Sequence, residues 1–452
     1  METSRIVFHG GAGKVTGANI EVRTANVRLL LDCGIEQGAH VCEECSYDPF
    51  PYKVDEIDAL IVSHAHMDHI GRIPRLVKEG YRGPIYMTTP TKDLSVIMWQ
   101  DAVRILKDEA DKAGREALYK EEDVHGAVSL IKGVSYHEEV SISEGVSFRF
   151  LDAGHILGSA IIELSLPDGV LAYTGDLGNT ASPLLKKTES LERADWLITE
   201  SVYGDRVHQS FDESIKILQK AIADTVLRGG TLLIPSFSIE RTQVLLHEIS
   251  NLFSEKKIPE VPVFLDSPLA IAVTEVYEAS HAFFSEDAQK EVLKEGSIFT
   301  FPFLKFVAHH GDSAKITRMS GPKVIIAGAG MSTGGRIRAH EKHLLPDAKN
   351  MILFVGYQAP GGLGRRIQDG AKKVTIDRVV TPVRAEVRTV SGFSAHADRN
   401  MLLDTVASAE KARTVFVALG EPDSASFIAQ RIHDFLGKKA IVPEEGKEYS
   451  LT

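Results

Sequence analysis

The sequence predicts a two-domain α/β protein, and three observations lead to this prediction. At 452 residues the chain is too long for one ordinary domain, so two domains with separate cores are expected. The first 200 residues contain many short runs of β-branched and aliphatic residues separated by Gly, Pro or Asp. After Tyr203, helical and strand-like segments alternate, which indicates βαβ units around a parallel sheet.

The first part of the chain contains the short strands of a layered domain. These strands are expected at residues 5–9, 19–23, 27–32, 59–63, 85–88, 146–152, 160–166, 170–174 and 196–199. One long polar segment, 94–119, has apolar residues at helical spacing and predicts a helix. Many strands with few helices predict sheets packed inside the domain.

The second part shows the helix and strand signals of a parallel sheet. Apolar residues at helical spacing follow Asp212, a candidate N-cap, and the helix should end at Gly229 and Gly230. A strand at 231–235 and a helix from about Arg241 follow, and further strands are expected at 261–265, 324–327 and 351–355. Glycine-rich turns at 328–335 and 361–364 follow predicted strands, where α/β folds place ligands.

The composition is that of an ordinary globular protein, with 43% hydrophobic and 25% charged residues. No apolar run reaches the roughly 18 residues that a spanning helix needs, so no membrane association is expected. The N-terminal residues run directly into a strand-like stretch without a secretory apolar region. Together with only three cysteines, this predicts a cytoplasmic location.

Charge is distributed unevenly along the chain. The net charge of −11 argues against a protein that binds nucleic acid over its whole surface. Residues 323–399 nevertheless carry 13 Lys and Arg against 6 Asp and Glu. A basic segment in an acidic protein fits a phosphate-binding groove, while a solvated face with clustered charges explains it equally well.

The strongest chemical signal is the segment HAHMDH at residues 64–69, directly after an apolar strand. Three imidazoles and a carboxylate within six residues would repel one another unless a metal ion used them. Imidazole and carboxylate suit zinc, and a solvent-accessible site would yield an activated water rather than a structural plug. We therefore predict that His64, His66, Asp68 and His69 bind metal.

This segment resembles the metal-binding signature of the metallo-β-lactamase superfamily, and the other parts of that pattern follow in order. Asp32, in LLLDCG, matches the buried aspartate that orients the metal loop without binding metal. His155, in DAGHILGS, matches a histidine ligand, and Asp176, in YTGDLG, matches the aspartate that bridges two metals. The resemblance implies an αββα sandwich of two sheets between helices.

The rest of the chain resembles the β-CASP nucleases within that superfamily. Glu200, in ITESVYG, and His396, in SGFSAHAD, match two of the special motifs of this group. Further matching segments lie at 234–243, 265–270, 330–336 and 355–366. The resemblance implies a metallo-β-lactamase domain at 1–203 plus 388–452, an inserted α/β domain at 204–387, and RNA held between them.

The family also implies a mechanism for RNA hydrolysis. His64, His66 and His155 would hold one zinc, Asp68 and His69 a second, with Asp176 as the bridge, and Mn²⁺ could substitute. Paired metals activate a water for in-line attack on a phosphodiester, and Asp68 would steer the hydroxide. His396, held cationic by Glu200, would protonate the leaving oxygen, giving 5′-phosphate and 3′-hydroxyl ends. The RNA contacts implied are Arg336, Arg365, Arg366 and Ser394, and a homodimer is expected.

One position departs from the family pattern. The last motif normally presents a histidine before Gly-Glu, and here Leu419 takes that place. Leucine cannot coordinate zinc, so the second metal should bind more weakly. A non-catalytic or weakly active RNA-binding subunit therefore stands as the alternative to a nuclease, and a hydrolase of small esters or thioesters as a third reading.

Two smaller groups of residues also contain candidate ligand side chains. His40, Cys42 and Cys45 lie close in sequence, but a structural zinc site needs four ligands, so a loop with free thiols is expected. Several other histidines, including His340 and His343, could contact phosphate, although helix faces explain them better.

Overall fold

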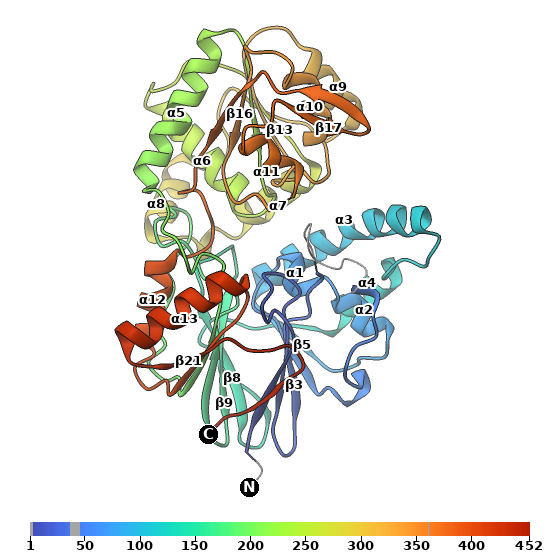
Figure 1. The fold of residues 1–452 in the computed structure, drawn as a ribbon, viewed down its shortest axis with the longest axis vertical. Coiled ribbons are helices and arrows are strands. Elements are labelled where there is room, and N and C mark those ends of the chain that lie inside the picture. The colour runs from blue at the N-terminus through green and yellow to red at the C-terminus, as the bar shows by residue number, and fades with distance from the viewer. Residues whose placement is uncertain (1–2, 37–45, 360) are drawn as a thin grey trace. The chain divides into compact units, whose positions relative to one another are not determined.

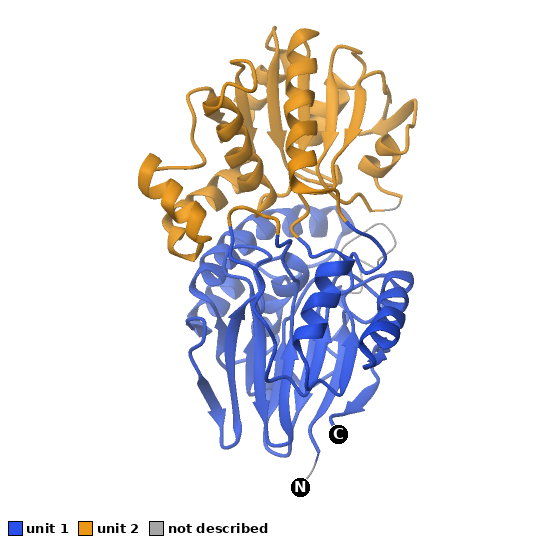
Figure 2. Ribbon diagram, turned by 90° about the vertical axis from the view of Figure 1, so that its left-hand side faces the viewer, with its two compact units in different colours: residues 1–180, 185–207, 396–452 blue, residues 181–184, 208–395 orange. Residues whose placement is uncertain are grey.

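The computed structural model describes residues 3–36, 46–359 and 361–452, and they form two compact units. One unit contains residues 1–180, 185–207 and 396–452, and the other contains residues 181–184 and 208–395 (Figure 2). The assignment of 1–203 plus 388–452 to one domain and 204–387 to an insert remains a prediction from the sequence.

The first unit is built on two seven-stranded mixed sheets (Figure 1). The first sheet has the order β22 (Glu448–Ser450), β1 (Arg5–Gly10), β2 (Asn19–Arg23), β3 (Arg28–Leu31), β4 (Ala59–Ile61), β5 (Ile85–Met87) and β6 (Ile131–Gly133). The second has the order β21 (Lys439–Ile441), β20 (Thr414–Val417), β11 (Trp196–Thr199), β10 (Gly169–Tyr173), β9 (Ala160–Leu166), β8 (Val146–Asp152) and β7 (Val140–Ser143).

Each sheet contains three consecutive antiparallel pairings and three consecutive parallel ones; the antiparallel part lies at the β22 end of the first sheet and at the β7 end of the second. The helices of this unit are α1 (Met67–Ile70), α2 (Ile73–Lys78), α3 (Thr89–Ala113), α4 (Glu121–Leu130), α12 (Arg399–Ser408) and α13 (Pro422–Leu436), and a 3₁₀ turn spans Val54–Glu56. The predicted helix at 94–119 corresponds to α3, which begins earlier because Thr88 caps it through Thr91 N.

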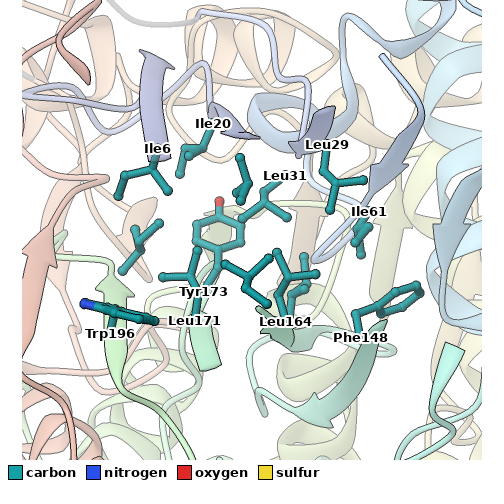
Figure 3. Packing of buried hydrophobic residues seen from close by; sticks show 14 of the residues in the cluster. Ile6, Ile20, Leu29, Leu31, Ile61, Phe148, Leu164, Leu171, Tyr173 and Trp196 are labelled. Carbon is teal, nitrogen blue, oxygen red and sulfur yellow. The ribbon is translucent and has the colours of Figure 1, made fainter. Parts of the chain in front are cut away.

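The core of this unit lies between the two sheets. Ile6, Ile20, Leu29, Leu31 and Ile61 of the first sheet face Phe148, Leu164, Leu171, Tyr173 and Trp196 of the second (Figure 3). The other face of the second sheet packs against α12 and α13 through a separate apolar cluster. The predicted αββα sandwich is therefore confirmed.

The second unit is built on a six-stranded, all-parallel sheet. Its strand order is β14 (Leu304–Phe306), β13 (Val263–Asp266), β15 (Lys323–Ala327), β12 (Thr231–Pro235), β16 (Met351–Phe354) and β19 (Glu386–Thr389). A hairpin of β17 (Lys373–Ile376) and β18 (Val379–Pro382) stands beside it. The parallel sheet predicted from the strand–helix alternation is confirmed.

The helices of the second unit are α5 (Phe211–Leu227), α6 (Arg241–Ser254), α7 (Pro268–Ala279), α8 (Glu286–Glu295), α9 (His310–Arg318), α10 (Ile337–Leu344) and α11 (Leu363–Gln368), with a 3₁₀ turn at His281–Phe283. The prediction of Asp212 as the N-cap of the first helix was wrong. Ser210 caps α5, its side chain accepting from Glu213 N at 3.2 Å, and Asp212 lies in the first turn. The sequence offers two capping side chains two residues apart, and only the local backbone decides between them.

Strand direction decides where functional side chains of the first unit can meet. Strands β3, β4, β8, β10, β11 and β20 each end just before a residue singled out by the sequence motifs. Within each sheet these strands run in the same direction, so their carboxyl ends lie along one edge. Among the residues that the structure describes, no helix has both the length and the apolar character needed to cross a bilayer.

Candidate metal centre

The predicted metal loop follows β4 and leads into the single turn of α1. Backbone N–H groups of Ala18, Cys33 and Ile35 hydrogen-bond to the carbonyl oxygens of Asp68, His69 and Met67, at 2.8–3.0 Å. The approach is so close that a Cβ on Gly34 would lie 1.6 Å from the Asp68 carbonyl oxygen. Only glycine fits at position 34. The segment after β3 therefore packs directly against the backbone of the metal loop and holds it in place.

Four donor atoms converge at this loop. The Nδ1 atom of His66 lies 3.1 Å from Nε2 of His64 and 3.2 Å from Nε2 of His155. The Oδ2 atom of Asp176 lies 3.4 Å from the same atom of His64 and 3.5 Å from that of His155. Zinc bound tetrahedrally at about 2.0–2.1 Å separates its ligands by about 3.3–3.4 Å. These donors therefore fit a single zinc ion, and we name them the four-donor cluster.

The electrostatics of the four-donor cluster also suit a cation. Burial and the neighbouring His69 lower the pKa of His64, and burial lowers the pKa of His66 and His155 well below the ordinary value. Burial disfavours the Asp176 carboxylate, but the facing histidines His69 and His64 outweigh it and hold its pKa well below the usual range. Neutral imidazoles beside an ionised carboxylate are the forms that bind zinc.

The second predicted metal position is less complete. His69 Nε2 is buried without a hydrogen-bond partner and lies 3.4 Å from Asp176 Oδ1. Burial lowers the pKa of His69, but the facing carboxylates of Asp176 and Asp32 outweigh it and raise that pKa well above its ordinary value. Asp68 is half-buried, and its pKa is raised by burial and by Asp176. Among the described residues, neither Asp68 nor His69 belongs to a group of three or more candidate ligands whose donor atoms all lie within 4.8 Å of one another.

Asp32 stands behind the loop at a positive φ of 58° and is fully buried. Its Oδ2 atom accepts a hydrogen bond from His69 Nδ1 at 2.7 Å, and its Oδ1 atom accepts from Ser63 N at 2.7 Å. It contacts the histidine ring on the side away from Asp176. Asp32 therefore holds the ring of His69, a residue that the sequence predicts to be a metal ligand.

Glu200 and His396 form a second group with Asp176. His396 Nδ1 lies 3.5 Å from Glu200 Oε1 and 3.8 Å from Asp176 Oδ2. Glu200 is buried and accepts backbone hydrogen bonds from Leu177 at 2.6 Å and Val202 at 3.3 Å. Burial raises the pKa of its carboxyl, and His396 opposes that shift. All three donors lie within 4.8 Å of one another, so the geometry alone permits either a proton-transfer pair or a metal ligand set.

Leu419, two residues after β20, lies in the apolar core of the first unit and is fully buried. Its φ is 49°, in the left-handed region that bulky residues rarely adopt. Its N–H donates to the Gly11 carbonyl at 2.7 Å, and a Cβ on Gly11 would lie 2.6 Å from its Cδ2 atom. The backbone makes an unusual turn here, while the side chain adds only apolar packing.

The predicted RNA contacts belong to the second unit. Arg336 donates to Asp266 Oδ1 at 2.6 Å and to the carbonyl oxygens of Val307 and Ala308, so its guanidinium is occupied by the protein. Arg365 pairs with Asp369, Arg366 is exposed, and Ser394 is buried.

Sequence reasoning missed two features of this chemistry. His340 is a buried partner of Asp266 at 2.6 Å and of Thr317 at 2.9 Å, which corrects its assignment to phosphate or to a helix surface. Ser63 and Tyr173 both contact Asp32, and neither carries a motif signal beyond its place next to one. The motif of His40, Cys42 and Cys45 lies outside the described residues.

Three family models match the chain. One described as "Metallo-beta-lactamase superfamily domain" covers residues 21–201, and one described as "Beta-Casp domain" covers residues 242–367. A third, described as "Zn-dependent metallo-hydrolase RNA specificity domain", covers residues 380–443.

Relatives extend the similarity over nearly the whole chain. Ribonuclease TTHA0252 of Thermus thermophilus is 37% identical over 400 residues, which are 88% of this chain and 90% of that protein. Transcription termination factor FttA of Methanocaldococcus jannaschii is 34% identical over 454 residues, which are 97% of this chain and 70% of that protein. A solved protein of unknown function from Enterococcus faecalis shares the fold, with a TM-score of 0.57 at 13% identity over 99% of this chain and 100% of that one.

The two-sheet sandwich and its four-donor cluster define a metallo-hydrolase of the metallo-β-lactamase superfamily. Within that superfamily the chain belongs to the β-CASP family, as the resemblance of its motifs predicted. It is therefore a metal-dependent hydrolase with the family's RNA specificity domain.

Proposed function

We propose that this protein is a zinc-dependent ribonuclease that cleaves RNA phosphodiester bonds and leaves 5′-phosphate and 3′-hydroxyl ends. The observation that carries the proposal is the four-donor cluster at zinc-ligand spacing, joined through Asp176 to the Glu200–His396 pair. A metal centre and a proton-donor candidate in one compact unit are the two components that phosphodiester hydrolysis needs.

In this proposal His64, His66, His155 and Asp176 would hold the first zinc. Asp68, His69 and Asp176 would hold a second metal ion, zinc or Mn²⁺, more weakly. When bound, the divalent ions would supply an activated water at neutral pH and offset the charge of the scissile phosphate. The half-buried Asp68 carboxylate would orient the attacking water by accepting a hydrogen bond from it.

His396 donates a proton to the leaving 3′-oxygen in the proposed reaction. Glu200 supports this role because its carboxylate faces His396 Nδ1 and stabilises the charged imidazole, leaving Nε2 for the substrate. The carboxylate is itself held by two backbone N–H groups, so it cannot swing away when the proton leaves. Protonation of the 3′-oxygen yields the 3′-hydroxyl end.

We propose that residues 204–387 form a domain that binds the RNA backbone. Arg365 and Arg366 on α11 are the best candidates, because both side chains are accessible to solvent: Arg365 is half-buried and Arg366 is exposed. Arg336 and Ser394 remain candidates from the family resemblance, although Arg336 would first have to release Asp266. We also propose a homodimer in the cytoplasm, which light scattering and cell fractionation would test.

The direct test is incubation of the purified protein with end-labelled single-stranded RNA, with and without a chelator. Cleavage that the chelator stops and added zinc restores supports the proposal, and the fragment ends test the predicted chemistry. RNA that is bound but left intact at every zinc and manganese concentration would favour a non-catalytic RNA-binding subunit, for which Leu419 is the supporting observation. Turnover of thioester or lactam substrates instead would favour a small-molecule hydrolase.

A further inference from the structure

The carboxylate of Asp32 collects more hydrogen bonds than the orientation of one histidine requires. Its Oδ2 atom lies 2.7 Å from each of three donors: Ser63 Oγ, His69 Nδ1 and Tyr173 Oη. Its Oδ1 atom accepts from Ser63 N at 2.7 Å. All of these groups are buried, so every one of these bonds is made away from water.

The count of protons fixes the direction of each bond. An ionised carboxylate only accepts, so Ser63 Oγ, His69 Nδ1 and Tyr173 Oη all donate to Asp32. Ser63 has one hydroxyl hydrogen, and it is spent on Asp32. The contact between Ser63 Oγ and His64 Nδ1, at 3.0 Å, must therefore be donated by the histidine.

Both histidine rings are thereby held in the same orientation. Each directs Nδ1–H to its supporting group and Nε2 to the metal centre: that of His64 in the four-donor cluster and that of His69 towards Asp176 Oδ1. In this orientation Nε2 is the ring atom that can bind metal. One carboxylate orients both rings, directly for His69 and through Ser63 for His64.

Tyr173 reaches Asp32 from inside the sandwich. It is the last residue of β10, its ring packs in the core between the sheets, and its hydroxyl extends from that core (Figure 3). Burial and the adjacent Asp32 raise the pKa of Tyr173 well above its ordinary value, so the hydroxyl keeps its proton and donates. The loop after β10 lies against Ser63 as well, because a Cβ on Gly175 would lie 2.6 Å from Ser63 Oγ.

The Asp32 backbone is held in place too. Its carbonyl oxygen accepts from Asn19 Nδ2 at 2.9 Å, and Asn19 Oδ1 accepts from the Tyr52 hydroxyl at 3.0 Å. Hydrogen bonds therefore hold Asp32 at its carbonyl oxygen as well as at its carboxylate. The carboxylate has little freedom to follow a displaced histidine.

We propose that Tyr173 and Ser63 are positioning residues for the metal centre and act through Asp32. Tyr173 governs the second metal position by fixing the acceptor of His69, and Ser63 governs both positions because it also holds His64. The inference rests on the proposed metal-dependent function, but it concerns metal affinity and not turnover.

The test compares Tyr173→Phe and Ser63→Ala with Tyr81→Phe. Tyr81 is a matched control, being a buried tyrosine of the same unit whose hydroxyl donates to the Pro84 carbonyl at 2.6 Å, away from the metal loop. Zinc affinity is measured by competition with a chromophoric chelator. Loss of a partner that orients a ligand typically weakens metal binding about 10–100-fold.

Tyr173→Phe should weaken the second binding step by about tenfold and leave the first unchanged, while Ser63→Ala should weaken both steps. Tyr81→Phe should lower the thermal midpoint without changing either step. The inference would be overturned if the unmodified protein bound zinc in two steps and Tyr173→Phe changed neither of them. It would also be overturned if the unmodified protein bound zinc in a single step. An unmodified protein that binds no zinc would overturn the proposed function itself.

Discussion

The metal loop at residues 64–69 and the basic segment at 323–399 both led to chemical predictions. In the structure, side chains of the metal loop converge with other donors on one site, whereas the predicted RNA-binding side chains of the basic segment do not. Histidines of the loop approach His155 and Asp176, which follow distant strands, at distances of 3.2 and 3.4 Å. In the basic segment Arg336 is bound to Asp266, Arg365 pairs with Asp369, and Arg366 is exposed. Metal ligation requires convergence of buried donors, so its sequence pattern is specific. Phosphate can be bound by any accessible cation, so a basic stretch does not say which residues bind.

The largest effect on the cleavage rate is expected from loss of the proposed proton donor, His396. This residue would add a catalytic group to the metal centre without binding the metal. His396→Ala should lower the cleavage rate by about 10²–10⁴-fold while zinc content and RNA affinity stay nearly unchanged. Single-turnover rates and metal analysis would measure this. His433→Ala, which removes an exposed histidine of α13, is the matched control. Zinc lost together with activity would make His396 a ligand, as its approach to Asp176 and Glu200 also permits.

Leu419 tests how complete the metal centre is. Leu419→His should tighten the second zinc and raise the rate without added metal, because it supplies an imidazole at the position where the family presents one. Leu419→Asn separates this from backbone strain, since asparagine tolerates the positive φ but is a poor zinc ligand. Dialysis followed by zinc analysis distinguishes the two variants. Two zinc ions retained by the unmodified protein would mean that another side chain already fills the position.

The salt dependence of RNA affinity tests which residues of the basic segment contact phosphate. Arg365→Ala and Arg366→Ala should each reduce the slope of log affinity for RNA against log salt by about 1, because each removes one phosphate contact. Arg336→Ala is the contrasting variant and should destabilise the second unit without changing that slope, since its guanidinium is bound to Asp266. If only Arg336→Ala changes the slope, the prediction is wrong. That result would mean that Arg336 leaves Asp266 and contacts the RNA.

The smallest effect concerns Glu341, which is buried on α10 with Ser332 as the partner of one carboxylate oxygen. Burial raises its pKa from 4.5 to about 8. Its contribution to stability is therefore fully present below pH 4.5 and is lost as the pH rises towards 8.

Glu341→Gln should remove that decline, so the variant should gain stability relative to the unmodified protein across this pH range. Unfolding midpoints as a function of pH would measure it, with the exposed Glu275→Gln as the control. Parallel curves for Glu341→Gln and the unmodified protein would show that Glu341 is ionised in the fold.

The part of the fold that the sequence predicted was the part with local periodicity. The alternation in residues 146–174 predicted β8, β9 and β10, and helical spacing predicted α3 and α5. Short strands such as β6 and β21 were missed because, unlike the equally short β4 and β5, they are partly exposed and contain no buried apolar run. Their pairing depends on neighbouring strands and not on their own residues.

The site shows the same division. Every donor of the four-donor cluster was predicted, since each lies in a motif with fixed chemistry. Tyr173 and Ser63 were not, because tyrosine at a strand end and serine before a histidine are ordinary core and loop residues. The hydrogen bonds that make them informative join positions 31 and 141 residues apart. No local pattern records such contacts.

The most direct test of the metal centre is the zinc K-edge X-ray absorption spectrum of the zinc-loaded protein. If His64, His66, His155 and Asp176 hold the ion, the first shell should contain only nitrogen and oxygen at about 2.0–2.1 Å, with the outer-shell scattering of imidazole rings. His155→Ala should remove one ring's contribution. A sulfur shell at about 2.3 Å would contradict this account and place the zinc on cysteine.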